Sequence, residues 1–464
     1  MRGVISAAGY VPYRRLQRSE IAATFGAGGG KGTRSVASFD EDTTTMGVEA
    51  ARLALRSTSL RPDALLFATA DPAYLDKTNA TAMHAALRLD GDVPALDAGG
   101  AIRSGPGALR LALERGGRTL VVAADARTGQ PTSPDEASGG DGAAALLVGD
   151  EAAGTVIAEY LGSGSATAEF TDRWRTPGER RSKVWEERFG ETKYVPLGEQ
   201  AWNTALKKLE LTPADVDHVV LAGMHARALR GLTRRLGVDS EVVADDLAGS
   251  VGNVGTAQAA LLLTRVLEGA APGKVVALVS LADGADVLLF RTTEAIADFT
   301  PTRSIAAQIG AAADLPYGKF LSWTGAVTVE PPRRPEPARV SSSAAGRTHV
   351  WKFAFVGSRD DDSGMLQMPP APGASDSAPM ADVQGTIATF TIDKLAYSPS
   401  PPIVFAVVDF DGGGRFPMEL TDVDAGDVKI GDRVEMTFRK LFTADGIHDY
   451  FWKARPIRGD AALS

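Results

Sequence analysis

The feature that most limits the possible folds of this chain is an internal repeat. A helix candidate that ends in a Leu-x-Pro turn and precedes an apolar strand occurs twice, 151 residues apart. The matching residues are Ala50, Ala54, Leu55, Leu60 and Pro62 in the first copy and Ala201, Ala205, Leu206, Leu211 and Pro213 in the second. A further set, at a spacing of 154, joins Leu109, Leu113 and Glu114 to Leu263, Leu267 and Glu268. Because this period is much longer than a solenoid repeat, we expect two similar half-domains, residues 1–155 and 156–295, that share one core.

Residues 1–295 alternate apolar runs of strand length with amphipathic helices. The strand candidates are Ala64–Ala68, Thr119–Ala124, Val219–Ala222 and Lys274–Ser280. They are short and apolar throughout, which is typical of strands buried on both faces. The residues Met46, Ala50, Leu53 and Ala54 follow helical spacing and predict one buried helix face. The pattern predicts a layered α/β domain.

The pattern changes after this domain. Residues 296–346 are predicted to be a proline-rich linker, because Val329–Arg347 contains Pro331, Pro332, Pro335 and Pro337. Proline at this density opposes a helix and favours an extended tether. A proline-rich crossing over the surface of one domain explains the same composition.

Residues 347–464 have the period of β-strands. The strand candidates are Gly385–Lys394, Ile403–Phe410, Arg433–Arg439 and Tyr450–Ala454, with turns at Asp411–Gly414 and Ile430–Asp432. Short strands joined by glycine-rich turns predict a small all-β barrel of the OB-fold kind.

Composition excludes several classes of function. The chain carries 49 basic and 58 acidic side chains, a net charge of −9, so we expect no nucleic-acid partner. No apolar run approaches the roughly 18–20 residues of a membrane span, so we expect no membrane partner and a cytoplasmic location. Cysteine is absent from all 464 residues. This absence excludes disulfides, thiolate zinc sites, Fe–S clusters and cysteine nucleophiles.

Three motifs in residues 1–295 carry a resemblance to a known family. They are Glu41-Asp42-Thr43-Thr44-Thr45-Met46, Gly140-Asp141-Gly142-Ala143-Ala144-Ala145 and Gly252-Asn253-Val254-Gly255. In this order and spacing they resemble 3-hydroxy-3-methylglutaryl-CoA synthases and ketoacyl synthase III relatives. The resemblance implies the thiolase fold, an internally duplicated five-layer α/β structure that normally forms a homodimer.

The carboxy-terminal region resembles a second family, the OB-fold proteins that accompany thiolases in acyl-CoA chemistry. The residues concerned are Gly357-Ser358-Arg359, Pro369-Pro370, Ile430-Gly431-Asp432-Arg433-Val434 and Tyr450-Phe451-Trp452-Lys453. Both families occur in multi-subunit complexes with a true thiolase. The resemblance therefore implies a separately encoded thiolase as a partner.

The positions that carry the family's chemistry are altered. A condensing enzyme needs a thiolate at a helix start, a proton carrier and an oxyanion site. Alignment with the family places Ile102 at the cysteine, Ala70 at the glutamate, and Ala222 near the histidine. A branched alkyl side chain cannot be acylated. We therefore expect a retained fold that has lost its reaction.

Three other residues keep alternatives open. Asp71 replaces the missing base if the alignment slips by one residue. His225 lies three residues after Ala222. It is either a catalytic histidine at a shifted position or a histidine at a helix start or on the surface. Asn253 matches the active-site asparagine of the family, although capping of its own turn explains it as well.

A charged stretch from residue 172 to 193 resembles an insertion of the synthase family. Its cations are candidates for the phosphates of CoA, and the alternative is a solvated charged face. The candidates are Arg173, Arg175, Arg180, Arg181 and Lys183. A CoA thioester is thus the expected ligand, with no covalently bound cofactor.

The accompanying OB-fold proteins usually carry a four-cysteine zinc ribbon before the barrel. Here Asp360 and Ser363 stand at the spacing of one cysteine pair, and the later ribbon region offers Asp376 but no His or Cys. Zn²⁺ prefers thiolate and imidazole, so we expect a degenerate ribbon without zinc. The run Asp360–Asp362 suits Ca²⁺ or Mg²⁺, or is a solvated acidic turn.

The leading hypothesis is a non-catalytic scaffold or docking subunit of a multi-subunit acyl-CoA complex. The partner thiolase would carry out carbon–carbon bond formation or cleavage, or acyl transfer. One alternative is a cysteine-independent acyl-CoA enzyme of the decarboxylase or retro-aldol type. The other is a CoA or acyl-CoA binding protein.

Overall fold

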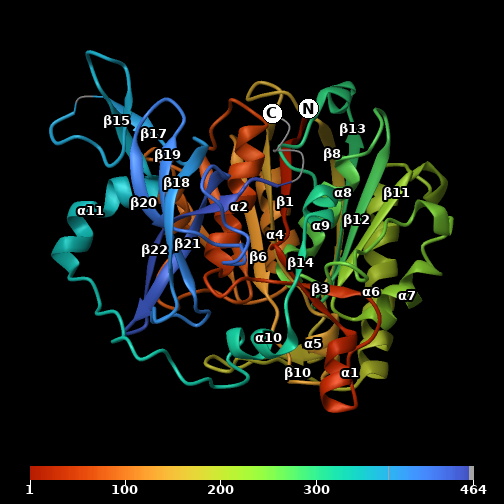
Figure 1. Cartoon of the computed structure of the whole chain (residues 1–464). Coiled ribbons are helices and arrows are strands. Elements are labelled where there is room, and N and C mark those ends of the chain that lie inside the picture. Colours follow the sequence, from red (N-terminus) through yellow and green to blue (C-terminus); the bar gives the residue numbers. More distant parts are fainter. Residues whose placement is uncertain (375, 459–464) are drawn as a thin grey trace. The chain divides into compact units, whose positions relative to one another are not determined.

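The computed structural model describes residues 1–374 and 376–458 and divides into two compact units (Figure 1). The first comprises Met1–Val36, Asp42–Thr81 and Leu89–Tyr317. The second comprises Ala37–Glu41, Ala82–Arg88 and the residues from Gly318 onward. The first unit thus extends to Tyr317 rather than to residue 295.

A nine-stranded sheet forms the frame of the first unit. Its order is β11-β12-β13-β8-β1-β7-β6-β4-β5 (Figure 1). The strands are β1 (Arg2–Tyr10), β4 (Ala64–Thr69), β5 (Ala95–Gly99), β6 (Thr119–Ala126), β7 (Asp141–Asp150), β8 (Ala158–Ala166), β11 (His218–Gly223), β12 (Val275–Leu281) and β13 (Ala285–Thr292).

The pairing pattern of this sheet confirms the duplication. In the first half β4 runs parallel to β6, and β6-β7-β1 are antiparallel. In the second half β11 runs parallel to β12, and β12-β13-β8 are antiparallel. Even β5, which pairs parallel to β4, has a counterpart in a single parallel bridge between Val219 and Val243. The halves meet where β1 pairs with β8.

Alternate residues of the strands face different helices, which builds the layers. In β12, Val276 and Leu278 belong to the core cluster that holds α4 (Ser104–Glu114) and α8 (Gln258–Leu267). Ala277 and Val279 belong to the cluster around α6 (Glu187–Lys208). Helices α4 and α8 contact each other and form the middle layer, while α2 (Thr43–Arg56) packs on β1, β6 and β7.

Close approach in the middle layer requires a glycine. A Cβ at Gly105, in the first turn of α4, would lie 2.1 Å from the carbonyl oxygen of Thr256. Thr256 lies in the 3₁₀ turn Gly255–Ala257 that leads into α8. Since real Cβ atoms do not approach so closely, only glycine permits α4 to begin here.

The other elements of the first unit are short. A small sheet is formed by β2 (Arg14–Gln17), β3 (Thr33–Val36) and β14 (Ala313–Asp314), and a hairpin by β9 (Arg173–Trp174) and β10 (Lys183–Val184). The remaining helices of this unit are α1 (Ser19–Phe25), α5 (Pro134–Ser138), α7 (Ala226–Thr233) and α9 (Ile305–Gly310). Two further helices cross the boundaries between the units: α3 (Ala80–Ala86) and α10 (Tyr317–Trp323).

The predicted linker 296–346 is partly folded. Helix α9 and strand β14 belong to the first unit, and α11 (Ser342–Ala354) begins inside the predicted linker. Ser341 caps α11 by accepting a hydrogen bond from the Ala344 N–H. The prolines end at Pro337, so nothing in the sequence opposes a helix beyond it.

The second unit contains a five-stranded sheet in the order β20-β19-β18-β21-β22 (Figure 1). The strands are β18 (Gly385–Asp393), β19 (Ile403–Phe410), β20 (Arg415–Glu419), β21 (Arg433–Ala444) and β22 (Ile447–Pro456). A bridge between Leu420 and Ala454 links the two edges into a barrel. Four strands lie where the sequence predicts them; β20 was not predicted. A three-stranded sheet of β15 (Val356–Arg359), β16 (Leu366–Gln367) and β17 (Ser377–Pro379) precedes the barrel.

A buried cluster of charges organises the second unit. Arg439 of β21 forms ion pairs with Glu41 and, at 2.7 Å, with Asp422. Lys453 of β22 lies 3.1 Å from Asp40, and both side chains are 1% exposed. Burial opposes the charge of Asp40, but Lys453 and Arg439 outweigh it and lower the pKa of that carboxyl. Residues 37–41 are therefore an integral part of the second unit.

Replacing Glu41 by Ala should destabilise this unit strongly. The change leaves the Arg439 guanidinium buried with one carboxylate fewer, which costs about 3–5 kcal/mol. Hydrogen exchange of the β21 and β22 amides, followed by mass spectrometry, measures the loss of protection. The matched control is Asp411→Ala, whose partner Arg433 is 43% exposed and whose loss should cost less than about 1 kcal/mol. Equal effects of both variants would contradict the prediction.

The first unit holds a buried acid at the junction of α8 and α9. Glu268 follows α8, and its two carboxylate oxygens accept from the Ile305 N–H at 3.0 and 3.2 Å. Burial raises the pKa of Glu268 to about 7, against the opposing influence of that N–H and of Arg265. Because the pKa in the folded state is raised, the resulting stability is complete below the unfolded pKa and is lost as pH rises through 7.

We expect Glu268→Gln to remove this pH dependence. The amide keeps an acceptor for the Ile305 N–H but does not ionise. Relative to the unchanged chain, the variant should gain about 2–3 kcal/mol in free energy of unfolding between pH 4.5 and pH 8. Urea unfolding at both pH values measures the difference. A constant offset at both pH values would show that Glu268 does not titrate in this range.

Candidate functional site

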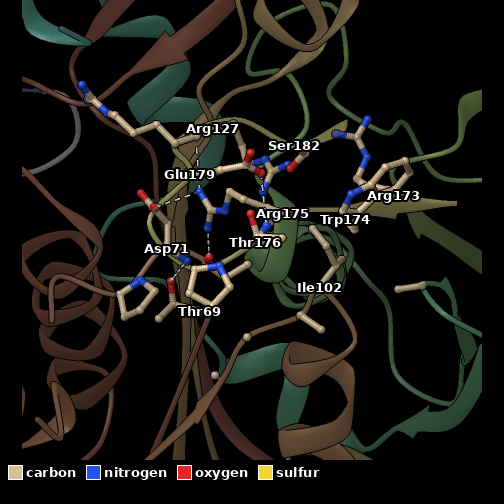
Figure 2. Close-up of a pocket in the computed structure, with 18 of the residues that line it drawn as sticks. Thr69, Asp71, Ile102, Arg127, Arg173, Trp174, Arg175, Thr176, Glu179 and Ser182 are labelled. Atoms are coloured by element: carbon tan, nitrogen blue, oxygen red, sulfur yellow. Dashed lines mark hydrogen bonds and ion pairs between the residues drawn. The ribbon is translucent and has the colours of Figure 1, made fainter. Parts of the chain in front are cut away.

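A cavity of 680 Å³ opens in the first unit where β4 ends and α4 begins (Figure 2). Its walls include Thr69–Pro72 after β4, Gly99–Ile102 before α4, and most of the segment from Asp172 to Ser182. Met224 and Leu281 extend the lining with apolar side chains. The walls thus come from both halves of the duplicated fold.

The start of α4 presents an alkyl group to this cavity. Ile102 lies one residue before Arg103, the N-cap of α4, and lines the cavity (Figure 2). The turn is held by Arg103, which pairs with Asp286 at 2.7 Å and donates to the Asp283 carbonyl at 2.9 Å. A helix N-terminus lowers the pKa of a thiol, so this is a suitable place for a nucleophilic cysteine. With isoleucine the position offers only apolar contact.

Asp125 shapes the wall beside Ala70. Its fully buried carboxylate accepts from the Thr69 hydroxyl at 3.0 Å and from the Ala70 N–H at 2.8 Å. The other oxygen accepts from the N–H and the hydroxyl of Thr256, both at 2.7 Å. Asp125 was not predicted from the sequence, although a single charge inside the apolar run of β6 was an available signal. Ala70 lines the cavity and supplies no carboxylate.

Asp71 is engaged in an ion pair. Its Oδ1 lies 3.2 Å from a guanidinium nitrogen of Arg175, and the same guanidinium donates to the Ala70 carbonyl. Burial raises the pKa of Asp71, while the charge of Arg175 opposes the shift. Figure 2 shows the Asp71 carboxylate turned toward Arg175 and Ile102 apart from both. Asp71 therefore faces the cavity as half of an ion pair.

The imidazole of His225 caps a helix. Its Nδ1 accepts from the Ala228 N–H at 3.0 Å in the first turn of α7, so the ring hydrogen resides on Nε2. Nε2 lies 2.8 Å from the Glu187 carbonyl and donates to it. Both ring nitrogens thus have backbone partners. Ala222, the aligned histidine position, is buried in β11 and is not among the cavity-lining residues.

Both ends of the Asn253 side-chain amide are hydrogen-bonded to the backbone. Its side-chain amide donates to the Gly223 carbonyl at 2.8 Å, and its Oδ1 accepts from the Gly255 N–H at 2.9 Å. Its backbone carbonyl also accepts from the Gly140 N–H. These bonds tie the loop before α8 to the ends of β7 and β11.

Most of the predicted phosphate-binding cations have carboxylate partners. Arg173 forms a bidentate pair with Asp135 at 2.8 and 2.7 Å, and Lys183 lies 3.1 Å from Glu179. Arg175 pairs with Asp71, as described above. Arg180 lines the cavity, whereas Arg181 and Lys183 are not among its lining residues. The structure thus brings Arg173, Arg175 and Arg180 together at one wall.

The segment predicted to be a degenerate ribbon is held by side-chain hydrogen bonds. One oxygen of Asp360 accepts from the N–H and the hydroxyl of Ser363, at 2.8 and 2.7 Å. Asp376 lies 3.9 Å from Arg359. Across residues 1–374 and 376–458, no group of three or more His, Cys, Asp or Glu side chains is arranged to hold a metal ion. The absence of zinc in the protein stays a prediction.

None of the helices in the described part of the chain is both long enough and apolar enough to span a membrane.

Two family models match parts of the chain. The model described as "3-Oxoacyl-[acyl-carrier-protein (ACP)] synthase III C terminal" matches residues 206–288, in the second half of the duplicated unit. The model described as "ChsH2, C-terminal OB-fold domain" matches residues 377–439, in the barrel.

Relatives of known family match more than three-fifths of the chain. The hydroxymethylglutaryl-CoA synthase of Methanopyrus kandleri is 30% identical over 312 residues, which cover 63% of this chain and 88% of the relative. The hydroxymethylglutaryl-CoA synthase of Pyrococcus horikoshii is 29% identical over 293 residues, covering 61% and 83%.

Solved structures share the fold. An HMG-CoA synthase crystallised with CoA superposes with a TM-score of 0.60 at 17% identity, over 74% of this chain and 93% of that one. The 3-oxoacyl-[acyl-carrier-protein] synthase III of Aquifex aeolicus superposes with a TM-score of 0.55 at 20% identity, over 63% and 100%.

These matches agree with the duplicated sheet, the α4 and α8 layer and the barrel. They confirm the resemblance drawn from the sequence motifs. The chain belongs to the hydroxymethylglutaryl-CoA synthase family, and it carries in addition a carboxy-terminal OB-fold domain of the ChsH2 type.

Proposed function

We propose that this chain is a non-catalytic subunit of a multi-subunit, thiolase-type acyl-CoA complex. The observation that carries the proposal is Ile102, which lines the cavity at the start of α4 in a chain that has no cysteine. Acyl transfer in this kind of site requires a thiolate, and isoleucine cannot form an acyl bond.

The neighbouring groups support the same conclusion. A base must be free to take a proton, but both nitrogens of His225 have backbone partners. Both ends of the Asn253 amide are bonded to the backbone as well. Asp71 is paired with Arg175. The side chains that survive near the site thus stabilise the fold.

The fused OB-fold domain supports a partner. On this proposal a separately encoded thiolase supplies the cysteine and the histidine, and the barrel docks it. The overall reaction is carbon–carbon bond formation or cleavage, or acyl transfer, next to a thioester. The ligand of the cavity is a CoA thioester, consistent with the relative that was crystallised with CoA.

A homodimer through the first unit is part of the proposal. Strand β5 is the last strand of the nine-stranded sheet, and Leu96 in its middle is 56% exposed. An edge strand with free backbone groups and an exposed leucine is suited to pairing with a second copy. Native mass spectrometry of the purified chain measures the stoichiometry.

One observation favours a second candidate, a cysteine-independent acyl-CoA enzyme. Asp71 faces the cavity, and burial raises the pKa of its carboxyl above the ordinary value although Arg175 opposes the shift. Decarboxylation and retro-aldol cleavage need a base and an oxyanion site but no thiol. Turnover of malonyl-CoA or a β-hydroxyacyl-CoA by the isolated chain, lost in Asp71→Asn, would establish this candidate.

A tagged chain isolated from its native host should co-purify with a thiolase in stoichiometric amount. We expect acyl-CoA turnover from the complex and none from this chain alone, because only the partner has the reactive groups. Mass spectrometry identifies the partner, and an unrelated protein with the same tag is the control. A homodimer that turns over acyl-CoA without a partner would refute the proposal.

Restoring the thiol alone should restore no reaction. We expect Ile102→Cys to form no acetyl-enzyme and to show no turnover with acetyl-CoA. Ala70 supplies no carboxylate, and both ring nitrogens of His225 are hydrogen-bonded to the backbone. Intact-mass spectrometry detects the acetyl adduct. Leu111→Cys places a thiol on the same helix at a position that is 65% exposed, and it is the matched control. Acetylation and turnover specific to Ile102→Cys would show that the remaining groups still support catalysis.

A further inference from the structure

We propose that residues 172–182 form a gate over the cavity and that the ion pair between Asp71 and Arg175 is its latch. We call these residues the gate segment. The inference rests on the proposed function in one respect, since a subunit that shares acyl thioesters with a partner needs controlled access to this cavity.

The gate segment forms one continuous wall of the cavity. Every residue from Asp172 to Ser182 except Arg181 lines it. The opposite side is formed by the end of β4 and the turn before α4, which hold Ala70 and Ile102. Movement of this one segment would therefore open the cavity.

Besides its hairpin partner β10, the gate segment has polar contacts with more distant parts of the first unit. Arg173 is bound to Asp135 of α5 by two parallel hydrogen bonds of 2.8 and 2.7 Å. The Arg180 carbonyl accepts from the Thr128 hydroxyl at 3.0 Å. Between these points Arg175 holds Asp71 at 3.2 Å and donates to the Ala70 carbonyl. Arg175 is thus the fastening that reaches the side of the cavity with Ile102.

Apolar packing contributes little to holding the gate segment over the cavity. Neither of the two core clusters in the described part of the first unit includes a residue of the gate segment. Trp174 makes an edge contact with Trp185, at 6.3 Å between ring centroids, and Trp185 itself is 64% exposed. Segments held by a few polar contacts open at low free-energy cost, without disturbing the core.

Arg175 obstructs the cavity and also holds the gate segment in place. Figure 2 shows its side chain extending from the gate segment to Asp71. The same guanidinium donates a hydrogen bond to the Ala70 carbonyl. Its side chain is 23% exposed and that of Asp71 is 43% exposed, so the pair is accessible to a competing charge. Release of this pair frees the wall between the gate segment and Ile102.

The absence of cysteine allows a direct test of access. In the full chain, Ile102→Cys creates a single thiol inside the cavity, and its rate of reaction with a maleimide reports how often the cavity is open. Leu111→Cys, on the same helix, gives the rate for an exposed thiol. All rates are divided by the rate of the same variant unfolded in urea, which corrects for the reactivity that the local sequence gives each thiol. In the folded chain the start of α4 lowers the pKa of a thiol and speeds its reaction, which works against the slow labelling expected of Ile102→Cys.

We expect Ile102→Cys to react at least tenfold more slowly than Leu111→Cys. Adding Arg175→Ala or Asp71→Asn should then accelerate its labelling by about two- to fivefold, the effect of losing one partly exposed ion pair. Asp71→Asn preserves side-chain size, so it tests the latch even if Arg175→Ala disturbs folding. Arg235→Ala removes an exposed ion pair with Glu199, neither residue of which lines the cavity, and it should leave the rate unchanged.

Two results would overturn the proposal. Equal labelling of Ile102→Cys and Leu111→Cys would show that no gate exists, and unchanged rates in both latch variants would show that the pair does not hold it. The labelling requires neither a partner nor turnover. A gated chain that co-purifies with no thiolase would therefore contradict the proposed function alone, and an ungated chain in a thiolase complex would contradict the gate alone.

Discussion

The pairing of β1 with β8 is the contact on which the rest of the first unit depends. It consists of two residue pairs, Gly3 with Glu159 and Val4 with Ala158. A Cβ at Gly3 would lie 1.9 Å from the Ala158 carbonyl oxygen, so only glycine lets the two strands approach. This junction brings the two halves of the sheet around α4 and α8. The start of α4, and with it the cavity, is placed by that arrangement.

The framework and the reactive groups of this fold are separable. The core is made by alternating strand residues and by the buried faces of α4 and α8, none of which needs a reactive side chain. Polar residues near the site, such as Asp125, His225 and Asn253, satisfy backbone groups that would otherwise be buried without partners. A chain can therefore have isoleucine at position 102 and still stabilise the loops around the cavity.

Charge has different roles in the two units. In the second unit Arg439 and Lys453 are almost completely buried, and their carboxylate partners come partly from residues 40 and 41. Those ion pairs hold a distant segment of the chain in the unit, and removing one partner leaves a buried charge. At the cavity, Arg175 and Asp71 are both partly exposed, so their ion pair is weaker and can be exchanged. Burial, more than the number of ion pairs, distinguishes a structural contact from a releasable one.

The sequence by itself determined the duplicated α/β architecture, the barrel strands and the absence of any thiol. These features depend on local periodicity, on fixed spacing and on residue identity, as at Ala50 and Ala201 or at Ile102. The sequence did not predict β20, helix α11 or the inclusion of residues 37–41 in the second unit. Only the tertiary structure decided that Arg175 pairs with Asp71, 104 positions away, and that the nitrogens of His225 are occupied. Such partners are chosen by the folding of distant segments onto one another, which no local pattern of residues records.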